Sequence, residues 1–367
     1  MLRIAYGVFG YGRGHATRAA AVLPALRARH VVQIFAGGDA YDQLAPEYPV
    51  TRIPTLGYVY GPGGRLSAWR TARRNAWHVL DLLLRGPAFE AVCETVADFR
   101  PDVIISDAEP WLHRVGRRLG IPRIGFDHFG ILVYCRPPLP LHDRIRGWRD
   151  VLVYRRLMGR PERVLVSSFY RARPRARGVQ VIPPLLRAEV LRQRPVHGDY
   201  LLVYFNRGTH QFTPAVEAAL RAIRLPARVY GTGRQGIDGL LDFRPLSNLP
   251  FVEDLAGCRA VVSTAGNQLV GEAVYLGKPL LVLPERAVEQ RLNGAMLARL
   301  GLGQCVRADR FSVDVLRAFL AREGEFRARL ARRRRDGRQA AVAALETFLF
   351  ELAGRRPPAA TPMAAAP

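Results

Sequence analysis

Cysteine, lysine and long apolar runs are the features that this sequence has little of. Its four cysteines lie far apart, with no CxxC pair and no cluster of histidines beside them. This spacing argues against a disulfide framework and against a metal site, and it favours a reducing, cytoplasmic compartment. No stretch approaches the roughly 20 uninterrupted apolar residues of a membrane span, and the N-terminus lacks the apolar core of a signal peptide. We therefore expect a soluble protein, or one that attaches to a membrane only at its surface.

Lysine occurs once, at Lys278, although the formal net charge is +24. The positive charge is thus almost entirely arginine, and together with the many Ala, Gly and Pro residues this is typical of a GC-rich genome. Residues 136–177 are still dense in arginine, interleaved with Tyr, Trp, Leu and Val. Such a segment can rest on an anionic membrane surface or can form solvated helix faces, and the sequence favours neither. Nucleic-acid binding is not expected, because the arginines are spread along the chain without a recognisable binding motif.

The length of 367 residues and the hydrophobic content of 49% favour two domains. Short apolar runs alternate with helix-like segments, which predicts an α/β fold with parallel sheets covered on both faces. Pro183-Pro184 and the polar stretch 192–199 interrupt the pattern, which then starts again. We therefore predict an N-terminal domain over 1–182, a linker over 183–199, a C-terminal domain over 200–353 and a disordered Ala/Pro-rich tail over 354–367.

The individual elements follow from these runs. In the first half we predict strands at 2–8, 31–36, 103–106, 123–126, 163–166 and 179–182, and helices at 14–29, 67–99 and 110–119. In the second half we predict strands at 200–205, 227–230, 261–263 and 279–283, and helices at 213–223, 268–276, 288–300, 313–321 and 325–352. Ligands of open parallel sheets bind at the carboxyl ends of the strands. The residues that directly follow each strand are therefore the candidates for function.

A glycine-rich turn, Gly10-Tyr11-Gly12-Arg13-Gly14-His15, follows the first strand. Its glycines let the backbone approach a ligand closely, and the helix N-terminus that follows favours an anion, so Gly12 and Gly14 are candidate donor-binding residues. The spacing differs from GxGxxG, and no acidic residue closes the second strand as an adenosine-ribose site requires. His15 is expected to face the crevice, where an imidazole suits a general base. Capping or packing against the helix is its alternative role.

A carboxylate that can support His15 follows the strand at 103–106. Asp107 is expected at the same edge of the sheet as the first turn. A carboxylate bonded to one imidazole nitrogen fixes the tautomer and stabilises the imidazolium. The alternative role for Asp107 is to cap the helix that begins near Pro110. Asp127 and His128, after the next strand, are weaker candidates on the acceptor side.

The second half carries a similar set of candidates after its strands. Backbone N–H groups at Gly266, Asn267 and Gln268 open a helix and would face a diphosphate. Glu272, further inside that helix, is a candidate acceptor for ribose hydroxyls, with an exposed helical glutamate as the alternative. Glu289, Gln290 and Asn293 follow the next strand, and an acid beside an amide suits the hydroxyls of a sugar ring. Asn293 fits capping or positioning equally well.

These residues together resemble a known family. The combination of GxGRGHATR near the N-terminus, SxAGxxxxxEAxxLGKPxLxxP and EQxxNxxxL is similar to the GT-B glycosyltransferases. The most similar members are the lipid II-forming N-acetylglucosaminyltransferase (MurG) and the UDP-glycosyltransferases. The resemblance spans residues 1–345 and is most specific over 261–300. It implies two Rossmann-like domains that face each other across a cleft.

The resemblance also implies an inverting transfer of a sugar from a nucleotide diphosphate to a hydroxyl, without a metal or a cofactor. His15 matches the base of the family and Asp107 the carboxylate that supports it. Glu272 matches the acid that binds ribose, while Glu289 and Gln290 match the pair that binds the donor sugar. A UDP-sugar is the expected donor.

Two positions depart from the family pattern. Leu269 stands near the place where a Thr is common, which puts one phosphate hydrogen bond in doubt. The turn after the strand at 200–205 contains Arg207, which can supply charge to the diphosphate or lie on the surface. The acceptor is expected to be a small or lipid-linked molecule bound by the aromatic-rich loops 57–70 and 129–149. The rival functions are a non-hydrolysing sugar-nucleotide 2-epimerase on the same fold, an inactive sugar-nucleotide binder and a basic nucleic-acid-binding protein.

Overall fold

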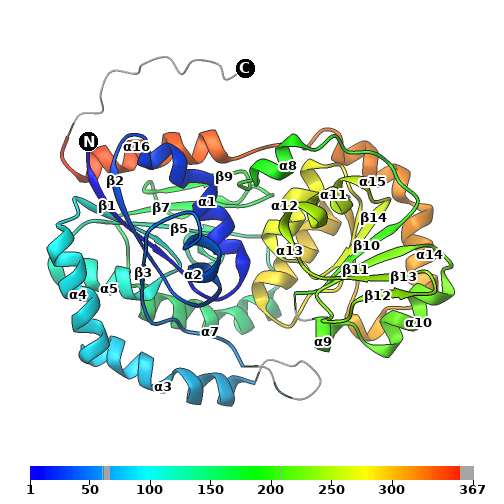
Figure 1. The fold of residues 1–367 in the computed structure, drawn as a ribbon, viewed down its shortest axis with the longest axis horizontal. Helices are drawn as coiled ribbons and strands as arrows, with labels where there is room; N and C mark the ends of the chain where they lie inside the picture. The colour runs from blue at the N-terminus through cyan, green and yellow to red at the C-terminus, as the bar shows by residue number, and fades with distance from the viewer. Residues whose placement is uncertain (60, 62–66, 207, 356–367) are drawn as a thin grey trace.

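The computed structural model describes residues 1–355 except for 60, 62–66 and 207. It contains two α/β lobes, the first at the left of Figure 1 and the second at the right. The first lobe is built on the seven-stranded sheet β3-β2-β1-β4-β5-β7-β9, in which every pair is parallel. The second is built on the sheet β12-β13-β11-β10-β14-β15-β16, where only the edge pair of β12 with β13 is antiparallel. The predicted α/β class with two parallel sheets is confirmed.

The strands are short and mostly buried. Those of the first sheet are β1 (Arg3–Val8), β2 (Val31–Ala36), β3 (Val50–Arg52), β4 (Val103–Asp107), β5 (Arg123–Asp127), β7 (Arg163–Ser167) and β9 (Val179–Ile182). Those of the second are β10 (Leu201–Tyr204), β11 (Ala227–Tyr230), β12 (Gly236–Asp238), β13 (Leu241–Arg244), β14 (Ala260–Ser263), β15 (Leu280–Val282) and β16 (Gly303–Cys305). A separate small ribbon joins β6 (Cys135–Arg136) to β8 (Arg173–Pro174).

Helices connect the strands. In the first half they are α1 (Arg13–Arg27), α2 (Gly38–Leu44), α3 (Ala68–Leu84), α4 (Pro87–Phe99), α5 (Pro110–Leu119), α6 (Gly130–Tyr134), α7 (Leu141–Met158) and α8 (Ala188–Arg192). In the second half they are α9 (Gly208–Gln211), α10 (Pro214–Ala222), α11 (Asn248–Gly257), α12 (Asn267–Tyr275), α13 (Val288–Arg299), the 3₁₀ turn η2 (Ala308–Arg310), α14 (Val313–Ala321), α15 (Glu323–Leu330) and α16 (Arg338–Leu352).

Both sheets are covered on both faces, which explains why their strands are continuous apolar runs. In β1, Ile4 and Tyr6 pack with α1, α2 and α16, whereas Ala5 between them packs with α4 and α5. In β10, Leu202 packs with α11, α12 and α13, and Val203 packs with α10 and α14. The alternation follows from the twofold period of side chains along a strand. The cores hold each sheet rigid, so that the residues beyond its strand ends are held in place.

The last helix returns to the first domain. Ala341, Leu345 and Leu349 of α16 are buried in the core that contains Leu2 and Ile4. The prediction that the C-terminal domain extends to residue 353 therefore needs correction, because α16 covers the first sheet instead of the second. The chain thus passes between the domains twice, once after β9 and once between α15 and α16 (Figure 1).

The two passages lie side by side. Gly337 donates its backbone N–H to the carbonyl oxygen of Pro184 at 2.8 Å. A side chain at residue 337 would collide with the carbonyl of Pro183, so only glycine fits there. On the other side, a Cβ at Gly271 of α12 would lie 2.7 Å from the Cβ of Pro184. The linker at Pro183 and Pro184 therefore packs tightly between Gly337 and α12.

Some predicted helices and loops differ from the structure. The helix expected over 67–99 is two helices, because Arg85 adopts a left-handed conformation and Pro87 begins a new helix whose first N–H groups are capped by the buried Asp81. The helix expected over 325–352 is likewise divided, into α15 and α16. The expected acceptor loop 129–149 contains α6 and the first half of α7. The tail beyond residue 355 lies outside the described residues.

Candidate active site

The register of the first sheet brings together the first turn and the end of β4. Val8, the last residue of β1, pairs with Asp107, the last residue of β4. Phe9 continues this pairing by donating its backbone N–H to the carbonyl of Asp107 at 3.0 Å. At Gly10 a side chain would collide with the carbonyl of Gly37, so the turn is tight only because glycine stands there. The turn delivers the N-terminus of α1 directly beside Asp107.

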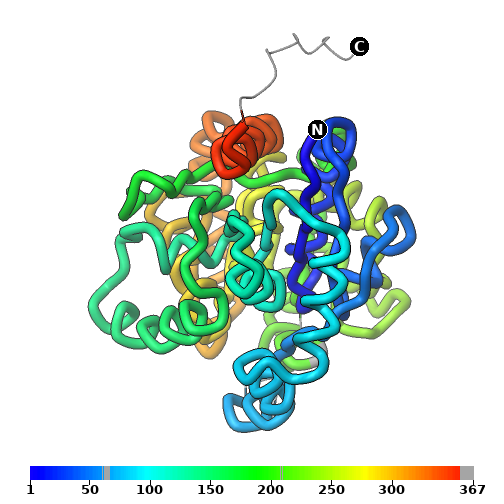
Figure 2. Tube along the Cα trace, turned by 90° about the vertical axis from the view of Figure 1, so that its left-hand side faces the viewer, coloured from blue at the N-terminus to red at the C-terminus, as the bar shows by residue number. Residues whose placement is uncertain are grey.

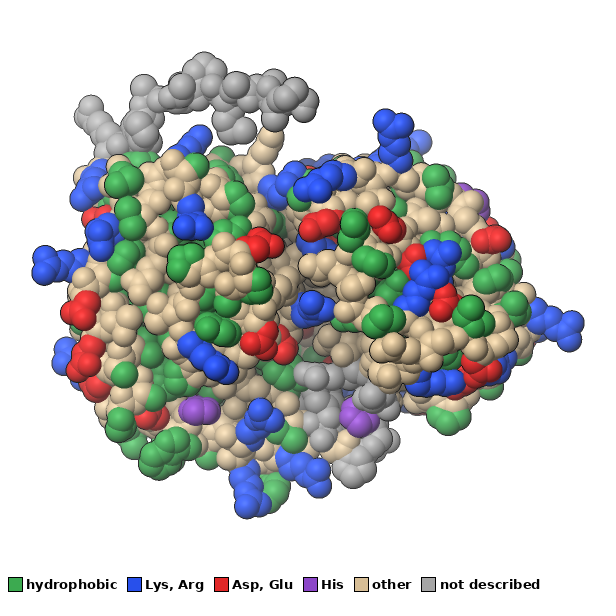
Figure 3. Space-filling model, viewed as in Figure 1, with side chains coloured by type: hydrophobic (Ala, Val, Ile, Leu, Met, Phe, Trp, Pro, Cys, Tyr) green, Lys and Arg blue, Asp and Glu red, His purple; other side chains and the backbone are tan. Residues whose placement is uncertain are grey.

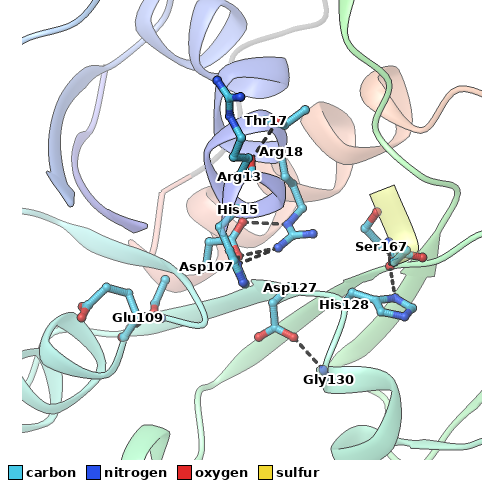
Figure 4. Close-up of polar contacts among 12 residues, drawn as sticks. Arg13, His15, Thr17, Arg18, Asp107, Glu109, Asp127, His128, Gly130 and Ser167 are labelled. Carbon is cyan, nitrogen blue, oxygen red and sulfur yellow. Dashed lines mark hydrogen bonds and ion pairs between the residues drawn. The ribbon is translucent and has the colours of Figure 1, made fainter. Parts of the chain in front are cut away.

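His15 and Asp107 form the hydrogen bond that their positions predict. Nδ1 of His15 lies 2.6 Å from Oδ1 of Asp107 (Figure 4). Asp107 is fully buried, whereas the His15 side chain is 25% exposed. Phe9 packs edge-on against the imidazole, with ring centroids 5.3 Å apart. The histidine is thus oriented from both sides, with part of its ring open to solvent.

Arg18 is a third member of this group that the sequence analysis did not identify. It lies one turn after His15 on α1 and donates two hydrogen bonds to Asp107, Nε to Oδ2 at 2.7 Å and Nη2 to Oδ1 at 2.6 Å. Burial alone would raise the pKa of Asp107, but the charge of Arg18 and then that of His15 outweigh burial and hold this pKa below its usual value. Asp107 is therefore ionised and accepts from both neighbours.

The ionised carboxylate selects the tautomer of His15. Because Asp107 can only accept, Nδ1 must carry a proton, and Arg18 Nη2 at 3.0 Å from Nδ1 is then a neighbour without a hydrogen bond. Among the described residues no group bonds Nε2 of His15. In the neutral ring Nε2 carries the lone pair. The arrangement presents an oriented base to a ligand.

Asp127 lies at the end of the neighbouring strand β5 and has a different role. Its carboxylate accepts from the Gly130 backbone N–H at 2.6 Å (Figure 4). It also accepts from the Tyr154 hydroxyl at 2.5 Å. Burial, together with the charge of Asp107, raises its pKa although these two hydrogen bonds act in the opposite direction. Asp127 therefore fixes the start of α6 and is not available to a ligand in this structure.

The second domain presents α12 opposite this site. A Cβ at Gly14 would be in van der Waals contact with the Cβ of Gln268, at 3.8 Å, so the first turns of α1 and α12 lie close together where the two domains meet. Figure 3 shows a furrow between the two lobes. Both helices follow a glycine, Gly12 and Gly266, and neither has a side-chain cap. At both glycines a Cβ would meet open space. Two helix N-termini that carry partial positive charge thus converge on one region.

Glu272 lies in α12, but its carboxylate is already engaged. Arg187, in the linker, donates Nε to Oε1 at 2.8 Å and Nη2 to Oε2 at 2.7 Å. Gln268 donates to the same Oε1 at 2.8 Å and also to the carbonyl of Leu185. Glu272 is buried, which rules out the alternative of an exposed helical glutamate. A ribose would therefore bind to a carboxylate that already accepts hydrogen bonds from Arg187 and Gln268.

Asn293 and Asn267 are buried between the domains. Asn293 donates Nδ2 to the carbonyl of Ala265 at 3.0 Å, and its Oδ1 lies 3.0 Å from Nε2 of His128 in the first domain. Nδ2 of Asn267 lies 3.4 Å from the carbonyl of Ser167, while its Oδ1 is buried without a partner among the described residues. In this structure Asn293 is fully buried and holds the loop before α12 in position.

Glu289 and Gln290 lie at the start of α13 and are partly exposed. Oε1 of Glu289 is 3.9 Å from Nε2 of His128, and Oε1 of Gln290 accepts from the backbone N–H of Glu285 at 3.1 Å. Nδ1 of His128 also faces an acceptor, the carbonyl of Ser167 at 2.7 Å (Figure 4). Both nitrogens of His128 thus face oxygen atoms, and this side chain joins the domains beside the predicted sugar-binding pair.

The structure brings most of the predicted residues together. Gly12, Gly14, His15 and Asp107 lie on one side of the furrow, with Gly266, Asn267, Gln268 and Glu272 on the other. Arg207 lies outside the described residues. Sequence reasoning missed Arg18 and Arg187, although the spacing of His15 and Arg18 places both on one helix face. Nothing in the local sequence links Arg187 to Glu272, which are 85 residues apart.

The described residues contain no group of three or more His, Cys, Asp or Glu side chains placed to hold a metal ion. They also contain no helix with both the length and the apolar character needed to cross a bilayer.

Comparison with known proteins gives consistent matches. A family model described as Glycosyl transferase family 1 matches residues 2–323. Among solved structures, the calicheamicin glycosyltransferase CalG4 matches with 18% identity and a TM-score of 0.66, over 95% of this chain and 98% of that chain.

Two plant enzymes match over similar lengths. Phytolacca americana UGT2, solved with UDP-2fluoro-glucose and pterostilbene, has 16% identity and a TM-score of 0.67 over 95% and 99% of the two chains. Arabidopsis thaliana UGT89C1, solved with UDP-L-rhamnose, has 17% identity and a TM-score of 0.68 over 96% and 99%. At these identities the likeness shows the fold, which is the GT-B architecture predicted from the sequence.

Proposed function

The chain belongs to glycosyl transferase family 1, and we propose that it transfers a sugar, with inversion and without a metal, from a nucleotide diphosphate to a hydroxyl. The observation that carries the proposal is the approach of two elements across the furrow. The His15–Asp107 pair stands on one side. The uncapped start of α12 stands on the other, close enough that a side chain at Gly14 would touch Gln268. An oriented base thus faces a ready site for a diphosphate.

The donor diphosphate is proposed to bind at the start of α12. The first N–H groups of this helix have no side-chain cap, and Gly266 leaves the space before them open. Helix N-termini stabilise phosphate through these N–H groups and the helix dipole. The start of α1 adds a second such terminus. As the bond to the sugar breaks, negative charge grows on the leaving phosphate, and preorganised dipoles stabilise that charge.

The nucleotide and the sugar extend from this point. Glu272 is proposed to accept from the ribose hydroxyls through the lone pairs that Arg187 and Gln268 leave free, and Glu289 with Gln290 to bind the sugar hydroxyls. The relatives solved with UDP-2fluoro-glucose and with UDP-L-rhamnose support UDP as the nucleotide.

The chemical step follows from the tautomer of His15. Nε2 takes the proton of the acceptor hydroxyl while the acceptor oxygen attacks the anomeric carbon from the side opposite the diphosphate. The bond from the anomeric carbon to the phosphate oxygen breaks, so the configuration inverts. Asp107 stabilises the imidazolium that forms, and Arg18 keeps Asp107 ionised for this purpose.

The acceptor is proposed to be a lipid-linked or aromatic hydroxyl compound. Tyr11 and Tyr58 pack edge-to-face near the first turn, with ring centroids 5.0 Å apart. Tyr60, in the aromatic-rich loop 57–70, lies outside the described residues. These two aromatic rings at the first turn form a surface on which an apolar acceptor can rest.

A membrane surface is proposed to deliver such an acceptor. Helix α3 lies at the bottom of the first domain in Figures 1 and 2, and α7 lies in its lower half. Both helices expose large apolar side chains. The most exposed are Trp69, Trp77 and Leu84 on α3, and Leu141, Ile145 and Trp148 on α7. Arg70, Arg74, Arg144 and Arg146 are interleaved with them. Aromatic and arginine side chains on one helix surface suit an anionic lipid interface.

Donor binding provides the first test. The purified chain is heated with UDP, dTDP, GDP or ADP and with their sugars, and the unfolding temperature is recorded. A nucleotide at 100 times its dissociation constant stabilises the fold by about 2.7 kcal/mol. The proposal predicts a clear shift with UDP and UDP-sugars that disappears in Glu272→Gln. No shift with any nucleotide would count against a nucleotide-sugar donor.

A further inference from the structure

A cavity of about 790 Å³ lies at the two passages between the domains. One wall is formed by the residues after β7 and by the end of β9 with Pro183 and Pro184. The other wall is formed by α12, α13, the end of α15 and the segment between α15 and α16. The volume falls within the range of small-molecule sites, about 300–1,000 Å³. None of the residues proposed for catalysis or donor binding lines it, so it is separate from the site described above.

The charged part of the lining is entirely arginine. Five arginines line the cavity, namely Arg171, Arg329, Arg332, Arg333 and Arg335, without a single Asp or Glu. Across the described part of the chain, none of these five side chains makes an ion pair or a hydrogen bond. Arg18 and Arg187 at the active site, by contrast, each bind a carboxylate through two hydrogen bonds. Five unpaired guanidinium groups around one cavity form a strong site for an anion.

The rest of the lining is largely apolar. Phe169 contributes from the first domain, and Val274, Met296 and Leu300 contribute from α12 and α13 of the second. Val274 and Met296 are almost completely buried, which places apolar surface deep in the cavity. The five arginine residues are exposed and lie toward its opening. A ligand that fills the cavity must therefore combine an apolar part with a negatively charged end.

Phosphate matches the charged end better than carboxylate. A single carboxylate is satisfied by one guanidinium fork, as Glu272 is by Arg187. A phosphate carries up to two charges and several acceptor oxygens, and arginine binds it with paired hydrogen bonds. Four of the five arginines come from one short stretch, 329–335, and Arg171 comes from the other domain. A single phosphate group can thus be bound from both domains.

We propose that this cavity binds a phosphate ester that carries an apolar group, either a soluble ester or a lipid. The charged end lies among Arg171, Arg332 and Arg333, and the apolar group lies against Val274 and Met296. The ligand contacts both domains at their linker. It also contacts α12 and α13, the two helices that carry Glu272 and Glu289 on the donor side.

Calorimetric titration of the full chain with octyl phosphate tests the proposal. Saturating UDP is present throughout, so that phosphate binding at the start of α12 is blocked if that site exists. The variant Arg332→Ala/Arg333→Ala removes two exposed side chains that directly follow α15. The matched control is Arg117→Ala/Arg118→Ala, two exposed arginines in the last turn of α5, away from the cavity. Inorganic phosphate and octanol are titrated in parallel.

The proposal predicts one molecule of octyl phosphate per chain. Its dissociation constant rises at least tenfold in Arg332→Ala/Arg333→Ala and changes less than twofold in the control. Inorganic phosphate and octanol each bind at least tenfold more weakly than octyl phosphate. The absence of octyl phosphate binding, or equal affinity in both variants, would overturn the proposal, as would equal affinity for octyl phosphate and inorganic phosphate.

A second titration with phosphatidic acid vesicles distinguishes the two sources of such a ligand. Vesicle binding that weakens in Arg332→Ala/Arg333→Ala, beyond any change in the control, supports a lipid ligand. If Arg332→Ala/Arg333→Ala weakens the binding of octyl phosphate but not that of the vesicles, the ligand is a soluble ester. If the two substitutions weaken neither octyl phosphate binding nor vesicle binding, the proposed site is wrong.

Discussion

Arg187 binds both carboxylate oxygens of Glu272, at 2.8 and 2.7 Å. The two side chains are 16% and 1% exposed, so this is a buried ion pair between the linker and the helix that is proposed to bind the donor. Removal of one partner of such a pair leaves an uncompensated buried charge. The pair therefore couples the stability of the fold to the proposed ribose site.

Glu272→Gln is expected to lower the free energy of unfolding by about 3–5 kcal/mol, because Arg187 loses its counter-ion. It is also expected to weaken UDP binding, because an amide is a poorer acceptor for ribose hydroxyls. Urea denaturation and calorimetric titration with UDP measure the two effects separately.

A double variant separates structure from binding. Arg187→Met/Glu272→Gln removes both charges, so it should regain part of the stability without regaining UDP affinity. Recovery of UDP affinity in the double variant would mean that Glu272 acts on the donor only through the fold.

Arg18→Gln tests why Asp107 is ionised. Without the guanidinium, burial becomes the dominant influence and the pKa of Asp107 rises. A protonated Asp107 no longer accepts from Nδ1 of His15, so the acid limb of the profile of kcat/KM against pH should move to higher pH. Activity at neutral pH should fall about 10- to 100-fold, a smaller loss than removal of the base itself. The exposed neighbour Arg13, changed to Gln, is the control, and an unchanged acid limb in Arg18→Gln would contradict the role given to Arg18.

The residues of the site were predictable where they follow strands. Asp107 ends a buried apolar strand, and His15 and Gly266 lie in the segments that follow one. Parallel strands bring such positions to one edge of the sheet. Arg18 and Arg187 were not predicted as partners, since their hydrogen bonds span 89 and 85 residues. Only Arg18 had a local signal, its position on the same helix face as His15. The buried state of Glu272 depends on Arg187 in the same way. Tertiary contacts thus decided how the carboxylates are held.

Acid should destabilise the fold through His113. This side chain is completely buried, both of its ring nitrogens lack partners among the described residues, and burial followed by the charge of Arg123 lowers its pKa to about 3 from 6.5. In this pH range His113 is protonated in the unfolded chain but neutral in the folded chain. The free energy of unfolding therefore decreases as the pH falls from about 6.5 to 3. His113→Leu should reduce this loss by up to about 4 kcal/mol. Urea denaturation between pH 7 and 3.5 measures it, with the exposed His142→Leu as control; equal losses in the two variants would contradict the prediction.

Vesicle binding tests the surface formed by α3 and α7. Trp69→Ser/Trp77→Ser/Trp148→Ser should weaken co-sedimentation with anionic vesicles at least tenfold, and added salt should weaken the wild type because arginine contributes. The control is Ile237→Ser/Leu240→Ser/Leu249→Ser, which removes three exposed apolar side chains from the second domain. Equal binding by the two variants would show that α3 and α7 are not the contact surface.

The fold was predictable to the level of its two sheets, because buried parallel strands appear as uninterrupted apolar runs. The position of α16 was not, since its apolar residues fit a core in either domain and only the passage at Gly337 directs it to the first. The break between α3 and α4 does have a local signal, the pair Gly86-Pro87, in which Pro starts a helix far more readily than it continues one.

The rate of UDP release by His15→Gln tests the central claim most directly. The rate is measured at saturating UDP-sugar, with an acceptor identified among phenols and lipid-linked sugars. The dissociation constant of UDP is measured for the same variant. The account predicts a rate 10²- to 10⁴-fold below that of the wild type, the usual contribution of a general base, with UDP affinity changed less than twofold. A rate equal to that of the wild type would contradict the assignment of His15 as the base.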